Sequence, residues 1–197
     1  MAACKDLINM FPAGGQSRLL VLVCCAPCCC AVVEALAKSC AATFFFYAPN
    51  IFPRAEYERR KAEVLRVCAH YGAEVVDCDS PPEDWERVAA GMEDEPERGM
   101  RCGACFLLRM ARAAEYASAN RFAAFASTLG FSRHKNPAQA DEAGRLASRR
   151  FGVPYVAADF RKSGGEARSR GIIRELGIYE QDYCGCRISL AKRRARV

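Results

Sequence analysis

Several features that define common protein classes are missing from this sequence. No stretch reaches the roughly 20 consecutive apolar residues that a helix needs to span a bilayer, so we expect no membrane segment. A GxGxxG motif is absent, which argues against a tight dinucleotide site. The CxxxCxxC pattern of radical enzymes that cleave S-adenosylmethionine is absent too. The two histidines, His70 and His134, have no partner at metal-ligand spacing, so we expect packing or surface roles for both.

Cysteine is what the chain has in excess, with 13 among 197 residues. An odd number cannot pair completely within one chain, and CxxC and CxC clusters in an intracellular protein favour metal or redox chemistry over structural disulfides. Hydrophobic residues make up 51% of the chain, so general disorder is not expected. The net charge of +6 permits a nucleic-acid substrate without requiring one.

The apolar run LLVLVCC, residues 19–25, follows Arg18 and is similar to the core of a signal peptide. However, residues 1–17 carry only a weak basic start. The run also continues into a segment that holds Glu34 and Lys38, rather than into a polar mature terminus. We therefore expect the protein to be cytoplasmic.

Strand-like and helix-like patterns alternate along the chain. The patterns predict strands at 19–25, 42–47, 74–78, 122–129 and 155–160, with helices at 27–39, 56–71, 81–91, 102–119, 136–150 and 172–176. This alternation indicates an α/β fold in which a doubly wound parallel sheet has helices on both faces. We expect one three-layer domain over 19–190, after a mobile extension, 1–18, in which Cys4 is incidental, and before a basic tail, 191–197.

Three groups of cysteines follow the ends of predicted elements. They are Cys24, Cys25 and Cys28 after the first strand, Cys102 and Cys105 entering a helix, and Cys184 and Cys186 near the C-terminus. Ligands bind at the carboxyl edge of an open α/β sheet, where the first group should lie. Helix N-termini stabilise thiolates, which are the ligand form, and we expect Cys28 and Cys105 in first turns. The sequence thus predicts a cysteine-rich metal site at this edge.

The number of thiols exceeds the need of one metal group. A four-iron cluster and a structural zinc each take four protein ligands, so seven well-placed cysteines imply a second metal or a dithiol beside the first. Cys24 and Cys25 point to opposite faces if the strand is still extended there, and reach one cluster only if the backbone turns. The spacing of the cysteines does not decide between a zinc site and an iron–sulfur cluster. We expect packing roles for the remaining thiols, Cys29, Cys30, Cys40, Cys68 and Cys78.

Several ordered motifs resemble one family. They are VCCAPC (23–28), FYAPNIFPRAEYERRK (46–61), RCGACFLLR (101–109), STLGFS (127–132), ADFR (158–161) and IYEQDYCGC (178–186). Over residues 18–189 the chain is similar to the cobalamin-independent epoxyqueuosine reductases of the QueH type. The resemblance implies a nucleotide-binding (HUP or Rossmann-like) α/β fold and a [4Fe-4S] cluster with a neighbouring iron or redox-active thiol pair. It also implies reduction of epoxyqueuosine to queuosine at the wobble position of the tRNA anticodon, with an external electron donor such as ferredoxin or flavodoxin.

Carried over to this sequence, Cys24, Cys25, Cys102 and Cys105 resemble the cluster cysteines. The resemblance leaves Cys28, Cys184 and Cys186 for the second metal or the redox pair. Two positions depart from the family. Many relatives have a histidine where this chain has Leu22, and an aromatic hydroxyl where it has Phe106. Neither position supplies a thiol, so the departures bear on proton donation or orientation rather than on cluster binding.

Removing an epoxide oxygen takes two electrons, two protons and an acid that assists C–O cleavage. Because a single cluster gives one electron at a time, a second redox centre beside it would explain the surplus thiols. Tyr183 and Asp159 adjoin the motifs and are candidate proton donors or orienting groups, with loop capping as the alternative. Three arginines flank the same motifs and are candidate contacts to tRNA phosphates: Arg101, Arg161 and Arg187. For the basic run at 192–196 we expect a solvated helix end.

Three other functions are alternatives to reduction. A zinc-stapled RNA-binding module without catalysis would use the same thiols. A tRNA sulfur transferase needs an SGGxDS-type loop after the first strand, but here the loop is CCAPCC, which offers no glycine backbone to cradle phosphate. The sequence Ser163-Gly164-Gly165 comes too late in the chain to replace that loop. A pure electron carrier would not need so large a sheet.

Overall fold

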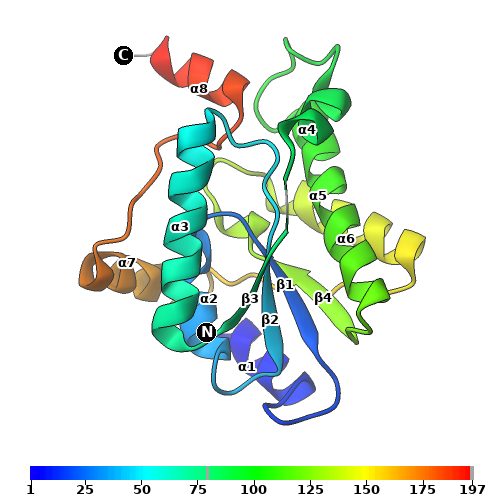
Figure 1. The fold of residues 1–197 in the computed structure, drawn as a ribbon, viewed down its shortest axis with the longest axis vertical. Helices are drawn as coiled ribbons and strands as arrows, with labels where there is room; N and C mark the ends of the chain where they lie inside the picture. Colours follow the sequence, from blue (N-terminus) through cyan, green and yellow to red (C-terminus); the bar gives the residue numbers. More distant parts are fainter. Residues whose placement is uncertain (79, 196–197) are drawn as a thin grey trace.

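The computed structural model describes residues 1–78 and 80–195 and is built on one parallel sheet (Figure 1). Its four strands lie in the order β3-β2-β1-β4. They are β1 (Leu19–Val23), β2 (Ala42–Phe46), β3 (Glu74–Asp77) and β4 (Ala124–Ser127). Every residue of β1 and β4 is buried, as expected of parallel strands covered on both faces.

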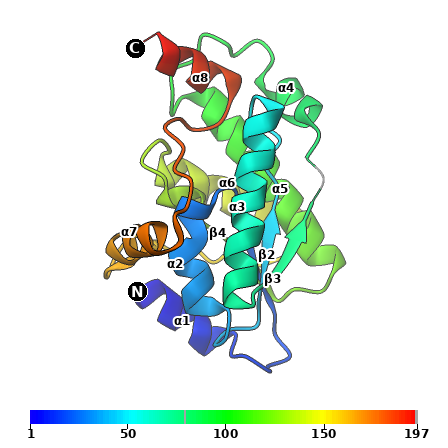
Figure 2. The ribbon, with the colours of Figure 1, turned by 60° about the vertical axis from the view of Figure 1, so that its left-hand side comes forward.

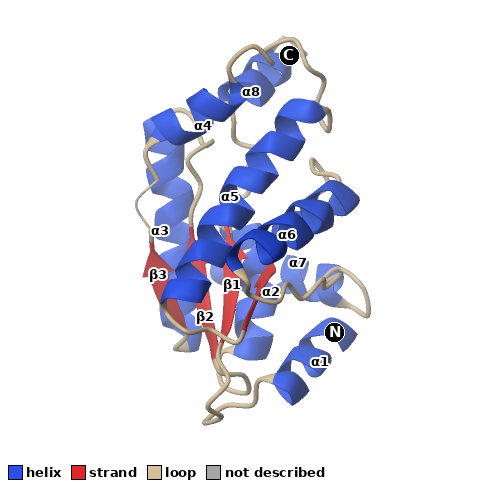
Figure 3. Cartoon of the chain, turned by 90° about the vertical axis from the view of Figure 1, so that its right-hand side faces the viewer, coloured by secondary structure: helices blue, strands red, loops and turns tan. Residues whose placement is uncertain are grey.

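Helices cover both faces of the sheet. Those described are α1 (Ala2–Met10), α2 (Ala26–Leu36), α3 (Arg54–Tyr71), α4 (Pro82–Ala89), α5 (Met100–Ala119), α6 (Pro137–Phe151), α7 (Gly165–Leu176) and α8 (Arg187–Arg194), with a 3-10 turn η1 (Leu129–Phe131). Helices α2 and α3 lie on one face, with α7 against α2, while α5 and α6 lie on the other (Figures 2 and 3). The predicted three-layer, doubly wound α/β fold is confirmed. None of the helices described is both long and apolar enough to cross a bilayer.

The strand order places a topological switch point between β1 and β4. From β1 the chain winds outward through β2 to β3, then crosses to the opposite side of β1 to form β4. In open α/β sheets, ligands bind beyond the carboxyl ends of the strands at this point. That edge faces the end of the molecule that carries α4 and α8 (Figure 1).

The sequence shows why the helices begin and end where they do. Pro27 lies in the first turn of α2, where its missing N–H costs nothing. The side chain of Asn136 accepts a hydrogen bond from the backbone N–H of Ala138 and so caps α6. Helix α3 ends at Gly72, whose φ of 67° is readily adopted by glycine.

The predicted fifth strand at 155–160 does not form. Only one bridge, Phe125 to Tyr155, joins this segment to the sheet. Beyond it, the carboxylate of Asp159 accepts a hydrogen bond from the backbone N–H of Arg161, at 3.1 Å. Such a local bond favours a turn over an extended strand. The following helix is longer than predicted, because α7 begins at Gly165 rather than at residue 172.

The prediction of a mobile extension over residues 1–18 is also wrong for the first half of that segment. Residues 2–10 form α1, which packs against α2 and buries Cys4 and Leu7 at helical spacing, with Phe11 buried just beyond. An antiparallel bridge from Pro12 to Cys40 fixes the segment after it. Cys4 is therefore a packing residue. At the other end, the predicted basic tail largely continues α8, whereas residues 196–197 lie outside the described part of the chain.

Candidate metal centre

The backbone turns where β1 ends, and this brings two neighbouring thiols to the same side. Cys25 is the N-cap of α2, and the Cys24 thiol donates to the Cys25 sulfur at 3.8 Å. The Lys135 ammonium donates to the Cys24 sulfur at 3.3 Å, although only 5% of Lys135 is exposed. The two sulfurs therefore lie side by side, as one shared cluster would require, and their binding of one cluster stays a prediction.

Helix α5 brings a second pair of thiols to the same edge. Because α5 begins at Met100, Cys102 lies in its first turn and Cys105 in its second, rather than Cys105 in the first as predicted. The backbone N–H of Arg98 donates to the Cys102 sulfur at 3.3 Å. Cys105 is buried and Cys102 partly exposed.

The third pair lies on the loop that leads into α8. Cys186 is the N-cap of α8, and its sulfur accepts from the backbone N–H of Ser189 at 3.4 Å. The backbone N–H of Cys184 donates to the Ser189 hydroxyl at 3.2 Å. The second and third pairs line one cavity, whose walls are Asn50, Trp85, Arg101, Cys102, Cys105, Phe106, Arg109, Lys135, Cys184 and Cys186.

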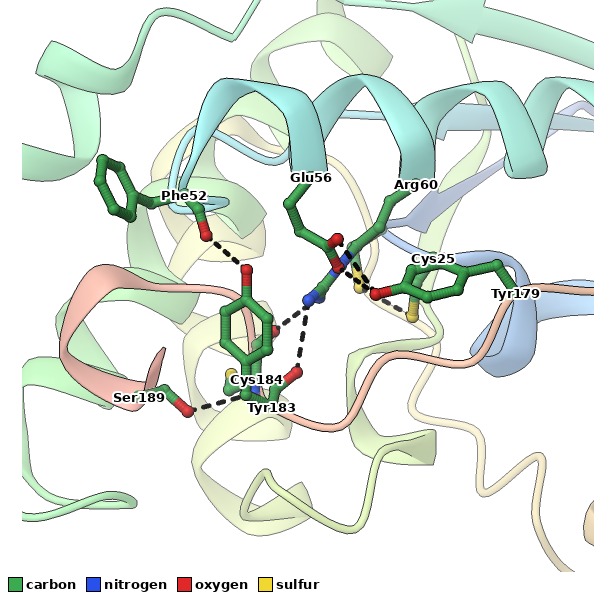
Figure 4. A network of polar contacts seen from close by, with 9 residues as sticks. Cys25, Phe52, Glu56, Arg60, Tyr179, Tyr183, Cys184 and Ser189 are labelled. Carbon is green, nitrogen blue, oxygen red and sulfur yellow. Dashed lines mark hydrogen bonds and ion pairs between the residues drawn. The ribbon is translucent and has the colours of Figure 1, made fainter. Parts of the chain in front are cut away.

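A buried arginine holds this loop in place (Figure 4). Arg60 is only 2% exposed and pairs with Glu56 at 2.7 Å, which in turn accepts from the Tyr179 hydroxyl at 3.1 Å. The Arg60 guanidinium donates to the carbonyls of Cys184, at 3.1 Å, and Tyr183, at 3.4 Å. The position of the CxC pair thus depends on α3, which lies more than a hundred residues earlier in the sequence.

Glycine is required between the two cysteines of this loop. Gly185 has a φ of 135°, and a Cβ there would lie 3.1 Å from the Arg60 guanidinium and 3.2 Å from the Asn50 amide. A side chain would therefore be strained in its backbone and crowded against the residues that hold the loop.

Positive charge faces the thiols without a matching acceptor. Arg109, 1% exposed, donates through Nε to the Tyr47 carbonyl at 3.2 Å, while its Nη2 has no hydrogen-bond partner. Arg101 Nη2 and Asn50 Oδ1 are also unpartnered, so three of the five such buried atoms in the described chain belong to residues of this one cavity. Unpaired buried donors are costly, and two guanidinium groups are matched to an anionic group.

The thiol form of the cysteines is favoured in the metal-free chain. The hydrogen bond to Cys25 and burial raise the pKa of Cys24 to about 12. Burial raises the pKa of Cys105 to about 12, against the opposing effect of Arg109. Metal binding must therefore displace protons from these thiols.

The donor set fits an iron–sulfur cluster in its chemistry. Soft thiols surrounded by buried cations suit a group that carries net negative charge. Within residues 1–78 and 80–195, no three histidine, cysteine or acidic side chains are grouped to hold a single ion. A cubane takes one thiolate at each of four corners, which spreads the sulfurs farther apart than around one ion. The cavity measures about 20 Å³, room for a water, so the thiols must rotate outward to admit a cluster.

Cys28 faces a different space from the other thiols. It lies in the first turn of α2 and lines a second pocket of about 220 Å³. The pKa of Cys25 is raised to about 11, lowered by Cys24 but raised more by Cys28 and burial, so Cys28 is also a neighbour of Cys25. The seven thiols therefore gather at one edge but do not line a single cavity, and their division between two metal groups stays a prediction.

The two candidate proton donors have structural partners. The Tyr183 hydroxyl donates to the Phe52 carbonyl, and burial raises its pKa to about 12. Asp159 is partly exposed and pairs with Arg161 at 3.4 Å and Lys162 at 3.8 Å. Both placements match the loop-capping alternative.

The three arginines that were predicted to contact phosphates lie in different surroundings. Arg101 is 2% exposed and does not face solvent, because its guanidinium donates to the carbonyls of Met92, Glu93 and Glu95. It is therefore not placed to contact tRNA phosphates, contrary to expectation. Arg187 is exposed and pairs with Glu86 at 3.1 Å over the Trp85 ring. Arg161 lines the second pocket.

Sequence reasoning missed the cations of the site. Lys135 follows the STLGFS motif by three residues, Arg109 ends RCGACFLLR and Arg60 lies within FYAPNIFPRAEYERRK, so all three were close to or inside the motifs. The two positions that depart from the family have different surroundings. Leu22 is fully buried in β1, and Phe106 lines the thiol cavity.

Two solved structures are similar to the chain only in part. NMN synthetase from Francisella tularensis has a TM-score of 0.47 at 12% identity, covering 97% of this chain and 90% of that one. U34-tRNA thiolase NcsA from Methanococcus maripaludis, with its [4Fe-4S] cluster, has a TM-score of 0.46 at 9% identity, covering 89% and 72%. The family assignment therefore depends on sequence.

The sequence comparisons agree on one family. The profile of the family described as epoxyqueuosine reductase QueH matches residues 19–192. A relative of that name from Acinetobacter baylyi is 44% identical over 75% of this chain and 68% of its own length. A relative from Histophilus somni is 43% identical over 75% of this chain and 61% of its own length. A relative from Thermotoga maritima is 34% identical over 78% of this chain and 81% of its own length. The chain therefore belongs to the epoxyqueuosine reductase QueH family.

Proposed function

We propose that this chain reduces epoxyqueuosine to queuosine at the wobble position of a tRNA anticodon. The reaction consumes two electrons and two protons, and the epoxide oxygen leaves as water. The observation that carries the proposal is the cavity lined by Cys102, Cys105, Cys184 and Cys186, with two buried arginines that have unpaired donors, in a chain of this family. A [4Fe-4S] cluster, when bound, would supply electrons one at a time.

Four thiols are proposed to hold the cluster: Cys24, Cys25, Cys102 and Cys105. The convergence of the first two sulfurs, at 3.8 Å, supports this set. Cys28, Cys184 and Cys186 then remain for a second iron or a redox-active pair. The glycine between Cys184 and Cys186 and the arginine that holds their carbonyls keep this pair beside Cys102 and Cys105.

The buried cations have a separate role in this proposal. Lys135 and Arg109 place positive charge against the thiols, which favours their anionic, metal-binding form. Tyr183 and Arg60 orient the loop between them. An external donor of the ferredoxin or flavodoxin kind would return electrons, in the cytoplasm.

Anaerobic reconstitution followed by turnover tests this function. Iron-loaded protein should be brown and should convert epoxyqueuosine in tRNA to queuosine, as measured by mass spectrometry of nucleoside digests. The zinc-stapled RNA-binding module makes the opposite prediction. A colourless protein that contains zinc alone and leaves epoxyqueuosine unchanged contradicts the reductase proposal.

A further inference from the structure

A second pocket opens beside the thiols, at the switch point of the sheet. It measures about 220 Å³ and lies between the first turn of α2, the segment after η1, and α7. Cys28 lies in its wall, and the neighbouring thiol of Cys25 belongs to the metal centre. The pocket therefore provides a route from the surface to the thiols that the thiol cavity, with its volume of about 20 Å³, does not offer.

The walls of this pocket offer groups that suit a nucleobase. Phe131 and His134 contribute two partly buried rings from the segment after β4. Burial and the neighbouring Arg133 lower the pKa of His134 below its usual value, which favours the neutral ring. Gln181 Oε1 is buried without a hydrogen-bond partner, so it can accept from a base or sugar donor. Unstacked RNA bases bind through such rings and edge contacts.

The rim of the pocket carries positive charge. Arg133, Arg161 and Arg170 lie around it. Arg161, which precedes α7, also lines an adjoining surface hollow together with Arg170 and Arg174 of α7. Three acidic residues also lie here: Glu166 pairs with Arg170, Asp159 pairs with Arg161 at 3.4 Å, and Glu180 lines the pocket, so a bound phosphate would share or replace these carboxylates as the partner of the arginines. Arginines beside a base-sized pocket are suited to the phosphates that flank one extruded nucleotide.

We propose that this pocket receives the extruded wobble nucleotide of the tRNA, with its modified side chain directed toward Cys28 and Cys25 and the flanking phosphates on the rim arginines. The inference rests on the proposed function, because it names where that substrate enters. It assigns Phe131, His134 and Gln181 to the base and Arg161 and Arg170 to the backbone. Arg101, buried on the other side of the thiols, has no part in RNA contact.

Two kinds of variant test the pocket in iron-loaded protein. Ile173→Trp adds bulk from the α7 wall, and Arg161→Gln removes one rim charge. The matched control is Arg149→Gln, since Arg149 is an exposed α6 residue whose only described ion pair is a long one, 3.6 Å, to Glu142. The probe is an anticodon stem-loop RNA carrying epoxyqueuosine, with Kd measured by fluorescence anisotropy at several salt concentrations.

The expected results differ between the variants. Ile173→Trp should weaken binding of the stem-loop by about tenfold or more, with unchanged iron content and circular dichroism. Arg161→Gln should weaken binding by about threefold to tenfold and should lower the slope of log Kd against log salt by about one. Arg149→Gln should bind like the unaltered protein.

The outcomes separate this inference from the proposed function. If unaltered protein binds the stem-loop but does not reduce it, while Ile173→Trp loses binding, the reductase proposal fails and the pocket stands. If unaltered protein is active and both pocket variants bind and react within twofold of Arg149→Gln, the pocket assignment is wrong. Should Ile173→Trp lose iron, Arg161→Gln and His134→Ala decide by the same criterion.

Discussion

Cysteines occupy two regions of this molecule that differ more in the charge around the thiols than in their burial. In the core, Cys29 and Cys68 lie between α2 and α3 with no exposed surface. At the carboxyl edge, Cys24 and Cys105 are almost as deeply buried, with 5% and 8% exposed. The pKa of Cys68 and that of Cys105 are both raised to about 12, in each case mainly by burial.

The difference lies in what surrounds the sulfur. The core thiols meet apolar side chains and backbone oxygens, as when Cys40 donates to the Leu7 carbonyl at 3.7 Å. The edge thiols meet Lys135 and Arg109, whose Nη2 has no hydrogen-bond partner. A raised pKa therefore does not separate packing thiols from ligand thiols in this chain, whereas buried cations with free donors do.

The largest effect is expected from removing one edge thiol. Cys102→Ala should abolish both cluster binding and activity, with a fall in turnover of more than about a hundredfold, because a ligand is lost outright. Iron content and conversion of epoxyqueuosine measure the two losses. Cys68→Ala is the matched control and should keep both. Normal turnover by Cys102→Ala would show that this edge thiol is no more important for the reaction than a core thiol.

The next effect is expected from the arginine that holds the CxC loop. Arg60→Met should destabilise the protein by about 3 kcal/mol, because it leaves the partly buried Glu56 without its cation and two carbonyls without their donor. Urea denaturation measures the loss. Arg66→Met, which breaks an exposed pair with Glu63, should cost less than about 1 kcal/mol. Equal losses in the two variants would show that Arg60 is not a special anchor.

Replacing the buried lysine should have an intermediate effect. Lys135→Met should lower activity by about tenfold, as expected for a group that supports a metal ligand. It should also shift the reduction potential of the bound cluster downward, because a positive charge favours the more reduced, more negative state. A redox titration followed by electron paramagnetic resonance measures the shift, and Lys135→Arg should restore most of it. An unchanged potential would separate Lys135 from the metal centre.

The smallest effect is expected in the core. Cys29→Ala removes a fully buried sulfur among apolar neighbours and should lower the free energy of unfolding by about 1 kcal/mol, with iron content unchanged. Thermal unfolding and iron analysis give the two numbers. Loss of iron in this variant would show that a core thiol belongs to the metal centre, and the core and edge thiols would then not differ in function.

Much of the fold was predictable because local pattern and tertiary structure agree. The apolar run at residues 19–23 is β1, and the helix spacing at 56–71 is nearly all of α3. The segment at 155–160 failed because Asp159 favours a turn, and α1 was missed because the helix is short and is followed closely by Pro12, Gly14 and Gly15. A local hydrogen bond therefore decided the first segment, and packing against α2 decided the second.

The candidate site was predictable in its thiols and not in its cations. The end of the first strand placed the first cysteine group at the carboxyl edge, whereas the positions of the other two groups beside it came from the structure. That Arg101 is buried could not be foreseen, because the carbonyls around it come from the loop that precedes α5. Likewise, Lys135 reaches Cys24 only through the pairing of β4 beside β1, a contact over more than a hundred residues.

The account depends on the edge thiols holding redox-active iron. The most direct measurement is iron, sulfide and zinc per chain in protein purified without oxygen, compared between the unaltered chain and Cys102→Ala. We predict about four or more iron and about four sulfide per chain, lost in the variant. Zinc without sulfide, or iron retained in full by Cys102→Ala, would contradict the account.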